Sequence, residues 1–172
     1  MTLHDSSRTL LIVWHSRTGA ARQLAQAAHD SAHIVLRKLG AAEHVNVVMR
    51  AAADASADDL LHADAYLFCA PENLGSLSGA MKEFFDRCYY DVLERISGRP
   101  YALAISAGSD GTGAARQTER ICTGWRLRAV APVLIVNTDA QTPEAILAEK
   151  TLDDAQRAQA AELGGTLAAL LA

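Results

Sequence analysis

Short, almost wholly apolar runs recur along the chain, at residues 9–14, 65–70 and 101–106. Such runs are typical of strands that are covered on both faces, as in the centre of a parallel sheet. Residues 44–49 alternate between apolar and polar instead, and residues 133–137 follow a proline, which is tolerated at a strand start or on a sheet edge. The pattern therefore predicts three central strands and two edge strands.

Helical patterns lie between these strands. Apolar residues recur at three- and four-residue spacing across residues 24–39 and 81–92, which predicts two amphipathic helices. We expect shorter helices around residues 58–61 and 114–122, and a terminal helix that includes residues 163–171. Together these segments make five β-α units with no linker or internal repeat between them.

The alternation of strands and helices predicts a doubly wound α/β fold, with a five-stranded parallel sheet, right-handed crossovers and helices on both faces. With the second and fifth strands as edges, the economical strand order is 2-1-3-4-5. In that order the switch point lies between the first and third strands, and ligands bind beyond the carboxyl ends of the strands there. We therefore expect the loops at those strand ends to carry the chemistry.

Composition supports one globular domain over residues 1–172, because half of the residues are hydrophobic, 21% are charged and only four are proline. The net charge of −4, with no basic stripe, argues against nucleic acid as a partner. No apolar run approaches the ~20 residues of a membrane-spanning helix, and the polar start is unlike a signal peptide, so the expected location is cytoplasmic, with no membrane partner.

The cysteines give no sign of a metal site or a disulfide. Cys69, Cys88 and Cys122 are odd in number and widely spaced, with no Cys-x-x-Cys pair and no neighbouring pair of histidines. We expect all three to be buried free thiols, and we expect no bound metal.

The turn after the first strand is small and rich in hydroxyl groups. Ser16 and Thr18 can donate hydrogen bonds to an anion, and Gly19 lets the backbone approach it closely. The N-terminus of the following helix would attract a phosphate through its exposed N–H groups and its dipole. An ordinary helix N-cap explains this turn about equally well, because Ser and Thr are favoured caps.

Two further loops follow the third and fourth strands, at residues 71–79 and 107–113. Gly75 and Gly79 permit tight turns in the first of them, and the second offers backbone donors and acceptors to the edge of a planar ring. Glycine-rich loops are also ordinary connectors. The coincidence of three such loops at consecutive strand ends favours a nucleotide-like ligand.

Other ligand classes that use similar sheets each need a residue that is absent here. A Rossmann dinucleotide site needs Gly-x-Gly-x-x-Gly after the first strand, and a P-loop needs Gly-Lys-Ser/Thr. A flavodoxin-like phosphatase needs a cysteine in the first loop, where His15 and Ser16 stand. A receiver domain needs an aspartate at the end of the third strand, where Cys69 and Ala70 stand.

Two motifs resemble known flavoprotein families. Residues 16–21 (SRTGAA) resemble the FMN phosphate loop of flavodoxins, Ser/Thr-x-Thr-Gly-x-Thr, except that Ala21 replaces the usual hydroxyl residue. Residues 71–82 (PENLGSLSGAMK) are similar to the Pro-Glu-Tyr-Asn-Gly-Ser-x-x-Gly-Ala-x-Lys stretch of NAD(P)H-dependent FMN reductases. The resemblance spans nearly the whole chain and implies a flavodoxin-like fold, bound FMN and redox chemistry.

The resemblance also implies a set of cofactor-binding residues. The flavin itself carries the hydride chemistry, so no catalytic side chain is expected. The phosphate would be held by Ser16, Arg17, Thr18, Gly19, Ala20 and Ala21. The isoalloxazine ring would be bordered by Pro71, Glu72, Asn73, Leu74 and Gly75. Its other side would be closed by Gly108, Ser109, Asp110 and Gly111.

An enzyme is the first hypothesis for function. A flavodoxin that only carries electrons usually stacks aromatic rings on its flavin and is strongly acidic, whereas here the third-strand loop offers only Leu74. An open flavin face would admit NADPH or NADH and then a quinone, a flavin or another small acceptor. The alternatives are a flavodoxin-like electron-transfer protein without direct NAD(P)H reactivity, and an interaction module that has lost FMN.

Several residues allow a functional and a plain interpretation. Arg17 or Arg116 could pair with the 2′-phosphate of NADPH, although each is also explained as a solvated arginine. His15 is expected to cap the strand end, and Asp110 before Gly111 is common in turns. The resemblance to the reductases implies a homodimer. Residues 138–154 receive no functional interpretation beyond a short helix near Pro143.

Overall fold

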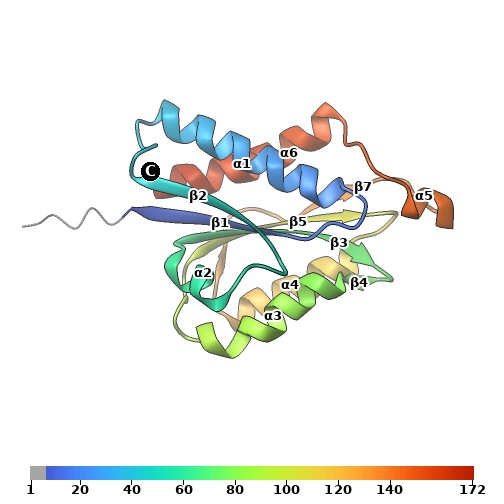
Figure 1. Cartoon of the computed structure of the whole chain (residues 1–172), viewed down its shortest axis with the longest axis horizontal. Helices are drawn as coiled ribbons and strands as arrows, with labels where there is room; N and C mark the ends of the chain where they lie inside the picture. Colours follow the sequence, from blue (N-terminus) through green and yellow to red (C-terminus); the bar gives the residue numbers. More distant parts are fainter. Residues whose placement is uncertain (1–6) are drawn as a thin grey trace, which may run out of the picture.

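The computed structural model describes residues 7–172, and Figure 1 shows a twisted sheet between two layers of helices. The elements follow one another in the order β1 (Arg8–Trp14), α1 (Ala20–Lys38), β2 (Val45–Ala51), α2 (Ala57–His62), β3 (Ala65–Asn73), β4 (Ser76–Leu77), α3 (Gly79–Val92), β5 (Pro100–Ala107), α4 (Thr112–Gly124), β6 (Arg128–Ala129), β7 (Leu134–Asn137), α5 (Pro143–Leu147) and α6 (Asp154–Leu171). The expected alternation of strands and helices is confirmed.

The sheet has the order β2-β1-β3-β5-β6, and β7 also pairs with β5. Strands β1, β2, β3, β5, β6 and β7 are all paired in parallel. The predicted order 2-1-3-4-5 is thus confirmed, with β6 and β7 together in the place of the fifth strand. The switch point falls between β1 and β3, as expected.

The observed strands differ from the predicted ones in two details. The third strand does not end at residue 70: β3 continues to Asn73 and pairs antiparallel with β4, so part of the expected 71–79 loop is a hairpin. The fifth strand is divided, because β6 pairs with the start of β5 and β7 with its end. Pro132 lies between the two segments, where it lacks the N–H group that a continuous ladder needs.

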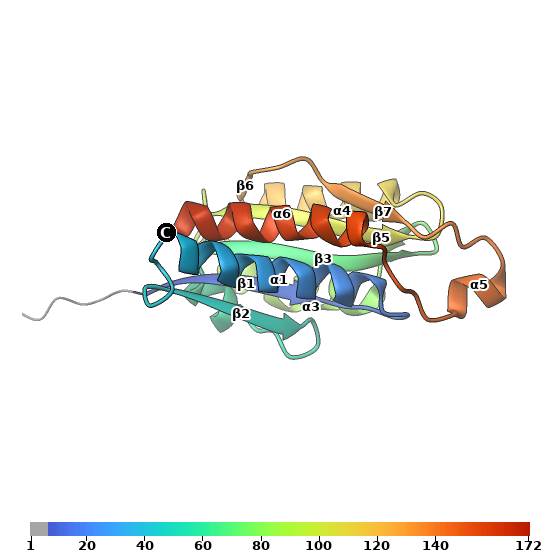
Figure 2. The same cartoon turned by 90° about the horizontal axis from the view of Figure 1, so that it is seen from above.

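Each face of the sheet has its own buried core. Helices α1 and α6 pack side by side over one face, as Figure 2 shows, and α2, α3 and α4 lie against the other. Gly164 makes the close approach of α6 to α1 possible, because a Cβ atom there would lie 2.1 Å from the carbonyl oxygen of Ala28. The central strands β1, β3 and β5 are buried on both faces over most of their length, which explains their mostly apolar sequences.

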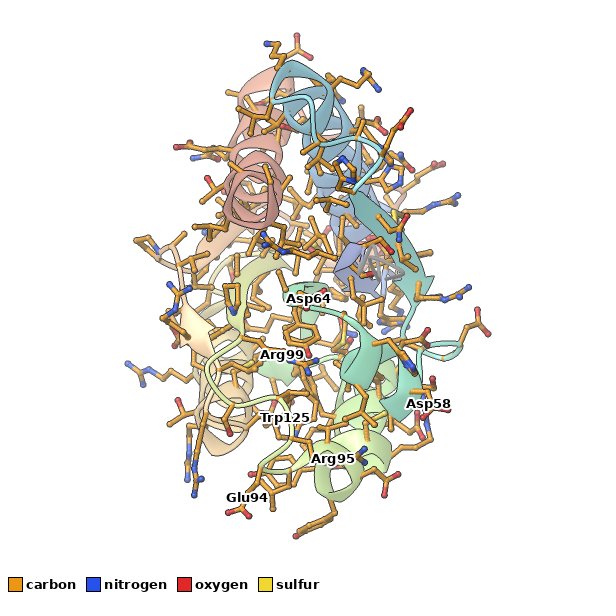
Figure 3. All side chains as sticks on the ribbon, turned by 90° about the vertical axis from the view of Figure 1, so that its left-hand side faces the viewer. Asp58, Asp64, Glu94, Arg95, Arg99 and Trp125 are labelled. Atoms are coloured by element: carbon orange, nitrogen blue, oxygen red, sulfur yellow. The ribbon has the colours of Figure 1, made fainter. Side chains whose placement is uncertain are left out.

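The end of the sheet where β1 begins is occupied by structural hydrogen bonds (Figure 3). The Arg99 guanidinium donates to the carbonyl oxygens of Leu60 and Leu61 at 3.0 and 2.8 Å, so it caps the last turn of α2. Tyr66 donates its hydroxyl to Leu60 at 2.6 Å, and burial raises its pKa to about 12. Within residues 7–172, no helix has the length and apolar character to cross a membrane.

Candidate cofactor site

A cavity of about 300 Å³ opens at the carboxyl ends of the central strands. It is lined by the loop after β1, the β3–β4 hairpin, the loop after β5 and the segment between β7 and α6. The lining residues are Arg17, Thr18, Ala20, Pro71, Glu72, Asn73, Leu74, Gly75, Ser106, Ala107, Gly108, Ser109, Thr138, Ala140, Ile146 and Lys150. The cavity therefore lies at the predicted switch point.

The loop after β1 presents hydrogen-bond donors at the start of α1. Helix α1 begins after Gly19, whose φ is 98°, and it has no side-chain cap. Ser16 accepts a hydrogen bond from the Gly19 N–H at 3.0 Å through its Oγ, which closes the loop on itself. Within residues 7–172, the backbone N–H groups of Arg17 and Thr18 meet no acceptor. These groups, with the helix dipole, fit a phosphate better than an ordinary N-cap.

The β3–β4 hairpin closes with a two-residue turn. Leu74 and Gly75 have φ values of 53° and 75°, the pattern of the type I′ turns that connect antiparallel strands. A leucine in this left-handed region costs about 1 kcal/mol, and its side chain here is fully exposed. The turn thus displays an apolar side chain at the cavity mouth in an unfavourable backbone conformation.

Helix α4 fixes the hairpin in place. Glu72 accepts hydrogen bonds from the N–H groups of Gly111 at 2.9 Å and Ala114 at 3.0 Å, one on each carboxylate oxygen. Its negative charge also lies at the positive end of the α4 dipole. Gly113 lies so close to the turn that a Cβ atom there would be 2.0 Å from the Gly75 carbonyl oxygen. The hairpin position therefore depends on the first turn of α4.

The loop after β5 is shaped by two close contacts. A Cβ atom on Gly108 would lie 2.6 Å from the Ala140 carbonyl oxygen, and one on Gly111 would lie 2.5 Å from the Ile135 side chain. Asp110 accepts hydrogen bonds from the backbone and hydroxyl of Thr112 at 3.2 and 2.8 Å, so its carboxylate is used at the start of α4. Gly108 and Ser109 face the cavity, and Asp110 and Gly111 lie outside its lining.

Part of the segment 138–154, which the sequence left without a function, forms the fourth wall. The Lys150 N–H donates to the Thr18 carbonyl at 2.8 Å. Gln23 donates to the Lys150 carbonyl at 2.7 Å and accepts from the Leu152 N–H at 3.0 Å. The Lys150 ammonium donates to the Ala145 and Ile146 carbonyls at 2.7 and 3.1 Å, at the end of α5.

The structure brings most of the predicted site residues together. Of the phosphate loop, Arg17, Thr18 and Ala20 line the cavity, whereas Ser16, Gly19 and Ala21 lie behind it; Ala21 is wholly buried. All five predicted hairpin residues line it. Six further lining residues were not predicted from the sequence: Ser106, Ala107, Thr138, Ala140, Ile146 and Lys150. Ser106 and Ala107 could have been predicted, because they end a central strand next to the loop at 108–111. Nothing in the sequence of residues 138–152 indicates that this segment packs against the loop after β1.

His15, in the loop after β1, is hydrogen-bonded to the segment that follows β4. Its Nδ1 is 2.9 Å from the hydroxyl of Ser78, the buried residue before α3, and burial lowers the pKa of the imidazole. The neutral ring is therefore the form that the fold favours. The three cysteines are buried free thiols as expected, and burial raises the pKa of the Cys69 thiol far above its ordinary value.

Comparison with known proteins identifies the family to which this chain belongs. The model of the NADPH-dependent FMN reductase family matches residues 13–141, and the chain belongs to this family. A flavodoxin of Aquifex aeolicus (strain VF5) is 28% identical over 104 residues, which are 60% of this chain and 52% of that protein. The chain thus spans about half the length of this curated relative.

Solved structures show the same fold at low sequence identity. A flavodoxin from the domain Archaea matches with a TM-score of 0.74 and 17% identity, over 95% of this chain and 98% of that one. An oxidoreductase from Corynebacterium diphtheriae matches with a TM-score of 0.70 and 20% identity, over 96% and 97% of the two chains. The fold is flavodoxin-like.

Membership of this family makes the chain a flavoprotein of the flavodoxin-like fold, with FMN as its cofactor. The cavity fits that cofactor chemically. Donors at the start of α1 suit its phosphate, and the hairpin and the loop after β5 offer apolar surface and backbone groups to a planar ring. Among residues 7–172, no group of three or more His, Cys, Asp or Glu side chains could hold a metal ion.

Proposed function

We propose that this chain is an NAD(P)H-dependent FMN reductase that delivers electrons to a quinone, a flavin or another small acceptor. The observation that carries the proposal is the open cavity mouth at Leu74, where none of the lining residues within 7–172 is aromatic. When bound, FMN accepts hydride from the nicotinamide and passes the electrons on, so the protein's part is binding, orientation and access.

The phosphate would be held at the start of α1. Thr18 offers its hydroxyl and N–H group, Arg17 offers its N–H group and an exposed guanidinium, and Ser16 keeps a hydroxyl proton free to donate. Gly19, Ala20 and Ala21 contribute backbone at the first turn of the helix. Because Ala21 has no hydroxyl and its side chain lies in the core, the backbone and Arg17 would supply the interaction that the flavodoxin motif assigns to that position.

The ring would lie between the hairpin and the loop after β5. Pro71, Asn73, Leu74 and Gly75 would border one side, with Glu72 holding the hairpin to α4. Gly108 and Ser109 would meet the other edge, and Asp110 and Gly111 would act from behind by shaping the loop. A nicotinamide needs one ring face free so that its reactive carbon can approach the flavin, and the exposed position of Leu74 leaves room for it.

A second candidate is an electron-transfer protein without NAD(P)H reactivity. It is favoured by the similarity to the Aquifex aeolicus flavodoxin and to the archaeal flavodoxin structure. The two candidates differ in their electron donor, which would be a coenzyme for the reductase and a protein for the carrier. They also differ in what must reach the flavin, a stacked nicotinamide in the first case and an exposed ring edge in the second.

Steady-state oxidation of NADPH and NADH by the FMN-loaded protein, with a water-soluble benzoquinone as acceptor, tests the proposal. The reductase should show coenzyme oxidation that depends on both substrates, with parallel double-reciprocal plots, because coenzyme and acceptor use the same site in turn. No oxidation above that of free FMN, by a protein that retains its flavin, would favour the electron carrier.

A further inference from the structure

Two histidines lie one turn apart near the middle of α1. His29 and His33 share one side of the helix, because residues four apart lie one above the other. Their Nε2 atoms are 3.3 Å apart and their ring centroids are 4.6 Å apart, so the rings converge at these two nitrogens. The His29 side chain is 25% exposed, so a solute can reach it. We call these residues the α1 histidine pair.

The α1 histidine pair lies away from the cofactor cavity and from the neighbouring helix. Ser31 and Val35 face α6, since a Cβ atom on Gly165 would lie 3.2 and 3.1 Å from their side chains. At about 100° per residue, the pair falls on the opposite flank of α1, the one toward β2 (Figure 2). With a rise of 1.5 Å per residue, His29 is about 15 Å along the helix from Gly19, where the cavity lies. The pair is therefore separate from the proposed function.

Asp30 prepares one of the two rings to bind a metal ion. The Nδ1 of His29 is 3.2 Å from the Oδ1 of Asp30, which also accepts from Gln26 at 2.9 Å. A carboxylate only accepts, so the proton of the neutral His29 ring is on Nδ1 and its Nε2 carries a lone pair. Metal-binding histidines in proteins commonly have such a carboxylate on the second nitrogen. His33 is then the donor between the rings, and its other neutral tautomer frees its Nε2 as well.

The distance between the two Nε2 atoms fits a tetrahedral ion. Zinc binds imidazole nitrogen at about 2.0–2.1 Å, and two nitrogens 3.3 Å apart would then form an angle of about 107° at the ion, close to the tetrahedral value. A square-planar Cu²⁺ site, with an angle of about 90°, would need the nitrogens about 2.9 Å apart. Imidazole ligands also disfavour Mg²⁺ and Ca²⁺, which prefer oxygen.

We propose that His29 and His33 chelate one Zn²⁺ ion through their Nε2 atoms. Asp30 is a positioning residue, which orients the His29 ring and offsets part of the charge of the ion. In the described part of the chain, no third His, Cys, Asp or Glu completes a group of three metal ligands with the pair. Water would therefore fill the remaining positions, and the ion should exchange readily and be removed by EDTA.

Calorimetric titration of the FMN-loaded protein with ZnCl₂, in a buffer without phosphate, tests the proposal. The wild type should bind one Zn²⁺ at the pair, and MgCl₂ should give no binding there. His29→Gln and His33→Gln should each weaken this binding at least tenfold, because one imidazole cannot chelate. Asp30→Ala should weaken it about tenfold, through loss of the carboxylate behind His29. His62→Gln, which removes an exposed histidine of α2, is the control and should match the wild type.

A shifted pair separates chelation from binding by independent imidazoles. The double variant His33→Gln/Ile34→His keeps the number of histidines but places them five residues apart, so they no longer share one side of α1. Ile34 is 44% exposed, so the variant should fold as the wild type does. It should lose Zn²⁺ binding as fully as His33→Gln does.

The outcomes are independent of flavin chemistry. Zinc binding that the pair variants and the shifted variant lose, and that His62→Gln keeps, would support the site even if neither coenzyme reduces the flavin. Binding that the shifted variant retains, or that falls equally in the pair variants and in His62→Gln, would mean an adventitious ion only and would overturn the proposal. The same holds if the wild type binds no Zn²⁺.

Discussion

The backbone N–H of Lys150 donates to the carbonyl oxygen of Thr18 at 2.8 Å, so residues 138–152 are bonded directly to the loop that would hold the FMN phosphate. The side chain of Gln23, one turn into α1, stabilises this junction with three hydrogen bonds. It donates to the carbonyl oxygens of Gly19 and Lys150 and accepts from the Leu152 N–H. The shape of the phosphate loop therefore depends on a segment more than a hundred residues away in sequence.

We expect Gln23→Ala to weaken FMN binding although Gln23 does not line the cavity. The substitution removes three part-buried hydrogen bonds at the junction, and at about 1 kcal/mol for each bond it should lower the free energy of unfolding by about 3 kcal/mol. Urea denaturation and a titration of flavin fluorescence measure the two effects.

Gln26→Ala is the matched control, because Gln26 lies on the same helix and bonds only the exposed Asp30. It should resemble the wild type in both measurements. If the two variants behave alike, the junction does not support the phosphate loop.

Thr18→Val tests the phosphate site itself. The substitution keeps the shape of the side chain and removes its hydroxyl, so FMN should bind about fivefold more weakly, the equivalent of about 1 kcal/mol. Thr123→Val, at the exposed far end of α4, is the control and should leave FMN affinity unchanged. An unchanged dissociation constant for Thr18→Val would remove that hydroxyl from the site.

Gly113→Ala should displace the β3–β4 hairpin. The new Cβ atom would meet the Gly75 carbonyl oxygen at 2.0 Å, and relief of such overpacking typically costs about 1–3 kcal/mol of stability. FMN affinity should fall with it, because the hairpin borders the cavity. Gly79→Ala, also in the first turn of a helix, adds a Cβ atom to open space and should be neutral or slightly stabilising in the same denaturation assay.

The sequence predicted the parts of this site that obey local rules. Apolar runs marked the central strands, and the small, hydroxyl-rich residues after β1 marked the first loop. The hairpin was missed because its turn is Leu74-Gly75, where Asn-Gly is the usual signal, and because the contacts that hold it come from Gln117 and Gly113 on α4. Lys150 and Ile146 were missed because their segment is polar and shows neither a helical nor a strand periodicity. A hydrogen bond from the distant Gln23 holds this segment in position.

Leu74→Trp tests the open face. An indole at this exposed position should cover the ring and slow flavin reduction by NAD(P)H severalfold, while FMN affinity holds or improves through stacking. Leu147→Trp places the same ring on an exposed leucine of α5 outside the cavity lining and should leave the rate unchanged. Stopped-flow absorbance under anaerobic conditions measures the rate of flavin reduction in both variants. An unaffected rate in Leu74→Trp would place coenzyme access elsewhere.

The half-buried imidazole of His15 should make the fold sensitive to acid. Its pKa in the folded chain is lowered from 6.5, so below about pH 6.5 the unfolded chain takes up a proton that the folded chain resists. The free energy of unfolding should therefore fall as the pH drops from 6.5 toward the folded-state pKa. His15→Asn can keep the hydrogen bond to Ser78 without titrating, and should flatten this part of the curve.

His62→Asn is the control for this pH dependence, since His62 is exposed and bonds only the Asp58 carbonyl of its own helix. Denaturation midpoints measured across this pH range for the three proteins give the comparison. If the stability of His15→Asn depends on pH as steeply as that of the wild type, His15 is not the source of the acid sensitivity.

FMN held in this cavity should be reduced directly by a nicotinamide coenzyme. The most direct measurement is the visible spectrum of gel-filtered, FMN-loaded protein under anaerobic conditions, before and after addition of NADPH and then NADH. Retained flavin that bleaches rapidly with either coenzyme is the predicted result. Flavin that is retained but stays oxidised would contradict the claim and favour an electron carrier, and flavin lost on gel filtration would contradict the cofactor site.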